Sequence, residues 1–221
     1  MFHWLEKNPF FFAVGVFLVI AYAGIVTILP DFMEQARPMK GTKPYTVLQL
    51  AGRHVYIKDS CNACHSQMIR PFKSETDRYG MYSMSGEYAY DRPFLWGSKR
   101  TGPDLWRVGN YRTTDWHENH MLDPMSVVPG SIMPKYGHMF SNAADIETAY
   151  AEAYTVKSVF NVPYDQPDMP ALGSWEEAKK AAFAEAKEIV DSMKNQEVKE
   201  AYEKGEIKEI VAIIAYLNSL K

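Results

Sequence analysis

Apolar residues are concentrated at the start of the chain. Residues 10–29 are uncharged and mostly apolar, and no charged residue falls between Lys7 and Asp31. About twenty such residues, at a rise of 1.5 Å each, are enough for a helix to cross a hydrocarbon core about 30 Å thick. We therefore expect one transmembrane anchor within residues 1–30, followed by a linker over residues 31–44.

A cleaved signal peptide is the competing interpretation of this segment. Ala21-Tyr22-Ala23 has the small-residue spacing of a cleavage site. The apolar run continues for six residues beyond it, which favours a retained anchor. The basic residues of the linker would by themselves place the following domain in the cytoplasm, but large domains cross membranes largely regardless of flanking charge. The charge pattern therefore does not fix the orientation.

Apolar residues at helical spacing predict two core helices, near the two ends of the rest of the chain. The first helix is expected over residues 45–57, with its buried face at Leu48, Ala51, Gly52, Val55 and Tyr56. The last helix follows Gly205 and has an apolar stripe at Ile207, Ile210, Val211, Ile214 and Leu217. We expect Gly52 to let the two helices cross closely, and Tyr56 and Tyr216 to pack where they meet.

The segment between these helices has two different patterns. Residues 66–136 are rich in Gly, Pro, Tyr and Arg without sustained periodicity, so they are predicted to be a long loop that wraps a ligand. Residues 143–160 read as a helix, and Ser174 with Glu177 forms a capping box that opens another helix running towards Met193. The prediction is therefore a mainly α domain over residues 45–221, with a helical insertion of unclear role.

Composition narrows the class of protein only moderately. The chain has 221 residues, of which 47% are hydrophobic, enough for one domain with a substantial core. Its net charge of -3, without a basic stripe, argues against a nucleic-acid partner. No internal repeat or low-complexity tract is present.

The clearest chemical motif is Cys61-Asn62-Ala63-Cys64-His65, which contains the only two cysteines in the sequence. This spacing is typical of c-type haem attachment, in which two thiols hold the porphyrin and the adjacent imidazole binds the iron. A thioredoxin-like pair would need a βαβ setting, and a zinc site would need a second pair of ligands. We therefore predict one covalent haem c bound by Cys61, Cys64 and His65.

The second axial ligand must be chosen among twelve methionines. Met133 precedes Pro134, which biases it towards an extended conformation from which a thioether can reach iron. Met125 and Met139 are the rival candidates, and the other methionines suit core filling. A further alternative is the pair His117 and His120, which is expected on a partly exposed helical turn.

A ligating histidine normally donates its other ring nitrogen to an acceptor that fixes its orientation. Pro103 is predicted to supply a carbonyl for His65, because proline has no competing N–H and Gly102 allows a close approach. Donors available to the haem propionates are Arg70, Lys99, Arg100 and Trp116, which the sequence does not rank. Ligation by Met133 and His65 would leave no open iron position and would describe an electron carrier.

The motif also bears on location and fold. Covalent haem attachment is ordinarily completed on the outer side of the bacterial inner membrane, so we expect a single-pass protein with a periplasmic domain. A helix just before the Cys-x-x-Cys-His motif, combined with a final helix ending in Ile-Ala-Tyr-Leu, resembles the class I cytochrome c fold.

Several longer motifs lie at residues 61–71, 75–80, 91–105, 116–120 and 131–136. Together they resemble the monohaem cytochrome c subunit, of CcoO or FixO type, of the cbb3-type cytochrome c oxidases. With the N-terminal anchor, the resemblance covers nearly all of the first 140 residues and resumes at the final helix. Residues 141–205 match the pattern less clearly.

This resemblance implies a non-catalytic electron-transfer subunit packed against a catalytic haem–copper oxidase subunit. Its electrons would come from a dihaem cytochrome c subunit or a soluble cytochrome c. Two alternatives remain open. One is the anchored cytochrome c subunit of a nitric-oxide reductase, which the block Phe94–Arg100 disfavours. The other is a catalytic or ligand-sensing haem protein, which would need an open or labile iron position.

Overall fold

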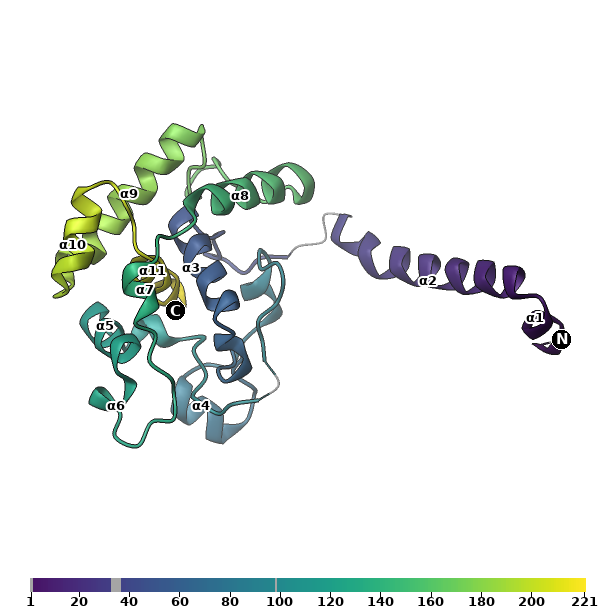
Figure 1. Cartoon of the computed structure of the whole chain (residues 1–221), viewed down its shortest axis with the longest axis horizontal. Coiled ribbons are helices and arrows are strands. Elements are labelled where there is room, and N and C mark those ends of the chain that lie inside the picture. The colour runs from purple at the N-terminus through teal and green to yellow at the C-terminus, as the bar shows by residue number, and fades with distance from the viewer. Residues whose placement is uncertain (1, 33–36, 98) are drawn as a thin grey trace.

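The computed structural model describes residues 2–32, 37–97 and 99–221, and within these ranges the regular structure is helical. Helices α1 (Phe2–Lys7) and α2 (Pro9–Phe32) extend from one side of the folded part that holds the other elements (Figure 1). The predicted mainly α architecture is confirmed. The predicted linker 31–44 and the block Phe94–Arg100 lie partly outside the described residues, at 33–36 and 98.

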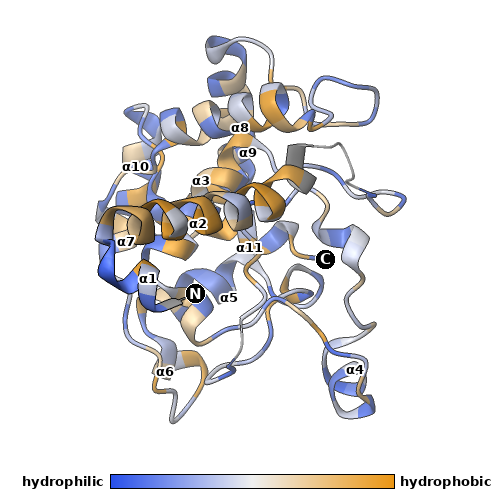
Figure 2. Cartoon of the chain, turned by 90° about the vertical axis from the view of Figure 1, so that its right-hand side faces the viewer, coloured by the Kyte–Doolittle hydropathy of each residue, from blue (hydrophilic) through white to orange (hydrophobic). Residues whose placement is uncertain are grey.

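Helix α2 is long and apolar enough to cross a membrane. Its segment Pro9–Leu29 has a mean hydropathy of 2.6, and Figure 2 shows hydrophobic residues along its length. Large apolar side chains stand out from it without cover, Phe10 being 72% exposed and Phe17 68%. Such a surface suits lipid better than water. The predicted apolar N-terminal helix is therefore present.

The core is built on the crossing of α3 (Val47–Lys58) and α11 (Glu209–Ser219). Helix α3 begins at a capping box in which Thr46 and Gln49 satisfy each other's backbone N–H groups. A Cβ on Gly52 would lie 1.9 Å from the carbonyl oxygen of Ala212, so only glycine permits this separation of the helices. The rings of Tyr56 and Tyr216 meet edge to face at 5.6 Å. Both expectations for this crossing are confirmed.

Helix α11 is buried more completely than its predicted stripe indicates. Every residue from Ile210 to Leu217 is buried, because other elements pack around the helix: α3, α5 (Thr114–Leu122), α7 (His138–Ser141), α9 (Trp175–Ser192) and the 3₁₀ turn Val108–Asn110. A helix that is apolar on all sides belongs in the centre of a fold.

Two helices cover this pair, α8 (Ile146–Phe160) and α9 (Trp175–Ser192), and α10 (Gln196–Glu203) packs on α9, as seen in the upper part of Figure 1. The capping box at Ser174 is present as predicted, whereas α10, capped by Asn195, was missed. Helix α9 packs through the small residues Ala178, Ala182 and Ala186, all buried. The segment of unclear role thus covers the central helices.

The prediction of a long loop over residues 66–136 was partly wrong. The segment contains α4 (Lys73–Tyr79), α5 (Thr114–Leu122) and α6 (Pro124–Val127), with 3₁₀ turns at Ser85–Tyr88 and Val108–Asn110. Another 3₁₀ turn, Cys61–Ala63, and the short α7 (His138–Ser141) flank it. These helices are short and hold few apolar residues at helical spacing, so no periodic pattern indicated them.

Candidate functional site

A cavity of about 710 Å³ opens between the Cys-x-x-Cys-His turn, the loop around Pro103, helix α5 and the loop before Tyr136. This volume lies within the range of cofactor sites. The five residues singled out from the sequence all line it: Cys61, Cys64, His65, Pro103 and Met133. The fold therefore brings three distant segments of the chain to one place.

The Cys-x-x-Cys-His turn follows directly from the end of α3. Ser60 adopts a left-handed conformation (φ 55°) that turns the chain out of the helix, and the N–H of His65 then donates to the carbonyl of Cys61 at 2.9 Å. The thiol of Cys61 is buried and that of Cys64 is exposed. Burial raises the pKa of Cys61 to about 12, which is opposite to the low thiol pKa of a redox pair.

The orientation of the His65 ring is fixed by its contacts with Gly102 and Pro103. Its Nδ1–H donates to the carbonyl oxygen of Pro103 at 2.8 Å, which leaves Nε2 with the free lone pair. A Cβ on Gly102 would lie 2.3 Å from Cε1 of this ring. Burial lowers the pKa of His65 against the opposing effect of this hydrogen bond. The imidazole is therefore neutral at pH 7 and its tautomer is fixed.

Asp104 ties the Pro103 loop to the segment after His65. Its carboxylate accepts hydrogen bonds from Ser66 Oγ at 2.7 Å, from the N–H of Met68 at 2.8 Å and from the N–H of Trp106 at 2.9 Å. The side chain is almost wholly buried. Buried carboxylates are stable only when satisfied in this way. The sequence suggested the role of the Pro103 carbonyl but not the role of the buried Asp104 beside it.

Two methionines line the cavity, Met133 and Met121. The N–H of Met133 donates to Ser131 Oγ at 3.2 Å, within the extended segment before Pro134. Of the two rivals named from the sequence, Met125 is 58% exposed and Met139 is fully buried, and neither is among the lining residues. Met121 was not singled out from the sequence, where it was grouped with the other methionines as core filler.

The prediction that His117 lies on a partly exposed turn was wrong. It is 2% exposed on α5, and His120 stacks on Trp116 at 4.4 Å between ring centroids. Burial lowers the pKa of each to about 4, with neighbouring positive charges acting in the same direction. Both imidazoles are therefore uncharged at pH 7 and form part of the cavity wall.

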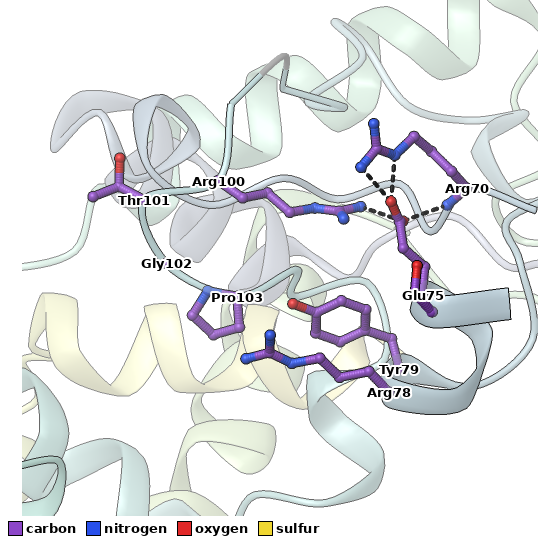
Figure 3. Close-up of a pocket in the computed structure, with 9 residues that line it drawn as sticks. Arg70, Glu75, Arg78, Tyr79, Arg100, Thr101, Gly102 and Pro103 are labelled. Atoms are coloured by element: carbon purple, nitrogen blue, oxygen red, sulfur yellow. Dashed lines mark hydrogen bonds and ion pairs between the residues drawn. The ribbon is translucent and has the colours of Figure 1, made fainter. Parts of the chain in front are cut away.

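Arg70 and Arg100 are engaged elsewhere. Both guanidinium groups converge on Glu75, as Figure 3 shows, and Arg100 Nη2 lies 2.7 Å from Glu75 Oε2. The hydrogen bond from Arg100 is the main reason that the pKa of Glu75 is lowered to about 2. Of the propionate donors considered from sequence, only Trp116 is among the cavity's lining residues.

A protein-family model described as the mono-haem subunit of cytochrome c oxidase, FixO, matches residues 2–221 of the chain. The chain belongs to the FixO family. None of the curated protein sequences matches it. The family match includes residues 141–205, so this segment belongs to the family pattern although its sequence resemblance was less clear.

Membership of the FixO family implies one haem, and the cavity suits it. The site combines two thiols, an imidazole with Nε2 free and thioether side chains around an apolar space. Imidazole and thioether groups are ligands of haem iron, and thiols form thioether bonds with the haem vinyl groups. The residues present therefore fit the group that the family implies.

Proposed function

We propose that the chain holds one haem c covalently through Cys61 and Cys64, with His65 and Met133 as the axial ligands. The observation that carries the proposal is the hydrogen bond from His65 Nδ1 to the Pro103 carbonyl, because it leaves the lone pair of Nε2 free on a ring that lines the cavity. Such a bond orients a ligating imidazole and raises its basicity. The adjacent thiols and the mono-haem family support the same assignment.

We further propose that the function is electron transfer within a cbb3-type cytochrome c oxidase. A haem with both axial positions filled takes up and releases one electron without binding substrate, and thioether ligation raises its potential. His65 and the Pro103 carbonyl would hold the haem rigidly on the histidine side, while α5 and the loop before Tyr136 would keep water from the methionine side. A rigid, dry site of this kind minimises rearrangement on electron transfer.

In this proposal α2 anchors the protein in the bacterial inner membrane and the folded part lies in the periplasm. The partners are the catalytic haem–copper subunit and, as electron donor, the dihaem cytochrome c subunit or a soluble cytochrome c. The family description names an oxidase, which favours this assembly over a nitric-oxide reductase. The length and hydropathy of α2 support the anchor.

Copurification tests this assignment. The full chain, purified from detergent-solubilised bacterial membranes, is expected to bring with it copper, b-type haem and oxygen-reducing activity, and to give a c-type pyridine haemochrome. His65→Ala is expected to abolish electron entry from cytochrome donors while the other subunits remain. Normal oxygen consumption by the purified His65→Ala complex would refute the proposed role.

The axial methionine is tested by carbon-monoxide binding to the reduced protein. Met133→Leu is expected to bind carbon monoxide, because it removes the thioether while conserving volume. Wild type and Met121→Leu are expected to bind none, and Met121→Leu is the matched control because it too lines the cavity. Carbon-monoxide binding by Met121→Leu alone would assign the ligand to Met121. Binding by wild type would favour a catalytic or sensing haem.

A further inference from the structure

The charges in the cavity wall are unbalanced. The described lining residues contain two arginines, Arg78 and Arg112, and neither Asp nor Glu. Elsewhere in the folded part most arginines hold a carboxylate or backbone carbonyls, as Arg70 and Arg100 hold Glu75 and Arg107 holds Glu87. A pair of uncompensated guanidinium groups at the edge of an apolar space is suited to an anionic ligand.

Arg112 is held in place without using its hydrogen-bond donors. The Arg112 Cζ lies 4.3 Å from the centroid of the Trp116 ring, and the Trp116 ring in turn stacks on the ring of His120. Stacking on an aromatic face leaves the N–H groups at the edge of the guanidinium free. Within the described residues Arg112 has no carboxylate at ion-pair distance, so these donors remain for a ligand.

Arg78 also lies against an aromatic ring in the cavity wall. Its Cζ lies 5.1 Å from the centroid of the Tyr79 ring. In Figure 3 its guanidinium points along Pro103 and away from Glu75, which Arg70 and Arg100 already occupy. Glu75 is thus satisfied by two other arginines, and among the described residues no carboxylate forms an ion pair with Arg78.

The two arginines lie towards the same part of the cavity. Both line the cavity together with Tyr111, and Arg112 Cζ lies 5.7 Å from the centroid of the Tyr111 ring. Burial raises the pKa of Tyr111, and the charges of Arg112 and Arg78 both oppose this rise. The pKa of Tyr136 is raised mainly by burial and further by the charges of Cys61, Asp59 and Cys64. In a haem the two propionates lie on the half of the ring that does not carry the vinyl groups, so they would point away from the cysteines.

We propose that Arg112 and Arg78 bind the two propionate carboxylates of the haem. This inference rests on the proposed function, since it requires a haem attached at the cysteines. It assigns the propionates to two residues that were not considered from the sequence. Arg70 and Arg100 are excluded as propionate ligands because both form ion pairs with Glu75. Each arginine would form charge-assisted hydrogen bonds with one carboxylate.

The test uses the full chain with haem whose propionate carboxyl carbons carry ¹³C, observed by redox-difference infrared spectroscopy. Arg112→Gln and Arg78→Gln are each expected to shift the labelled carboxylate bands and to lower the midpoint potential, because an uncompensated negative charge stabilises the ferric state. Arg70→Gln is the matched control, since it removes the same charge outside this cavity and leaves Glu75 with Arg100. It is expected to leave the labelled bands as in wild type.

Haem content by pyridine haemochrome in the same samples separates the two proposals. Haem-loaded Arg112→Gln and Arg78→Gln proteins with wild-type bands would overturn the carboxylate assignment alone. A wild-type chain without haem would overturn the proposed function and this inference with it. If a glutamine variant fails to accumulate, Arg112→Lys and Arg78→Lys keep the charge. They are expected to shift the bands with a smaller change in potential, and unchanged bands in them would also overturn the assignment.

Discussion

Replacing Gly102 by alanine should displace the imidazole of His65. The added Cβ would lie 2.3 Å from Cε1, 2.8 Å from Nδ1 and 2.9 Å from Nε2 of the ring. Ordinary contacts begin near 3.4 Å, so the ring has to move by about 1 Å. The backbone of residue 102 is not in the left-handed region, so the perturbation comes from this contact rather than from backbone strain.

The cost has two parts. A shift of about 1 Å breaks the 2.8 Å hydrogen bond to the Pro103 carbonyl, which contributes about 0.5–1.5 kcal/mol net. Overpacking against a held ring costs about 1–3 kcal/mol. Gly102→Ala is therefore expected to lower the free energy of unfolding by about 2–4 kcal/mol. Loss of the hydrogen bond also makes the imidazole less basic, so the midpoint potential should rise.

The assay is a guanidinium chloride titration of the detergent-solubilised full chain, combined with a redox titration of the same sample. Gly137→Ala is the control, because a Cβ there has nothing within 4 Å and its φ of -56° suits alanine. An unfolding midpoint and a potential equal to those of wild type in Gly102→Ala would refute the reasoning, because the ring would then not be confined by residue 102.

Two further predictions concern the packing of the core and the stability of the fold at low pH. Gly52→Ala is expected to lower the free energy of unfolding by at least about 2 kcal/mol despite the better helix propensity of alanine, because its Cβ would lie 1.9 Å from a backbone oxygen of α11. If this variant unfolds at the same denaturant concentration as wild type, the close crossing of the helices is contradicted. The pKa of Glu75 is lowered from 4.5 to about 2 in the folded state, so its contribution to stability is complete above pH 4.5 and is lost as the pH falls towards 2. Glu75→Gln should therefore lose less stability than wild type between pH 4.5 and 2 in circular-dichroism unfolding, and parallel losses in both proteins would contradict the ion pairs with Arg70 and Arg100.

Local patterns in the sequence determined the elements that depend on near neighbours. The apolar run of α2, the capping box at Ser174 and the stripe of α11 are set by residues a few positions apart, and the structure has all three. Gly52 was identified because a glycine on an otherwise apolar face indicates a close approach. The motif around Cys61 predicted its chemistry for the same reason, since its spacing is itself the signal.

Tertiary structure decided what depends on residues far apart in the chain. The short helices α4 and α5 have weak periodicity, so no local pattern indicated them, and the position of α5 follows from its packing against α6, α9 and α11. Whether a side chain is free depends on its partners: Arg70 and Arg100 are occupied by Glu75, whereas Arg78 and Arg112 are left to the cavity. Burial of His117 and the presence of Met121 in the wall likewise come from the way α5 lies against the rest of the fold. The sequence therefore determined which chemistry is available, and the fold decided which of the equivalent side chains can carry it out.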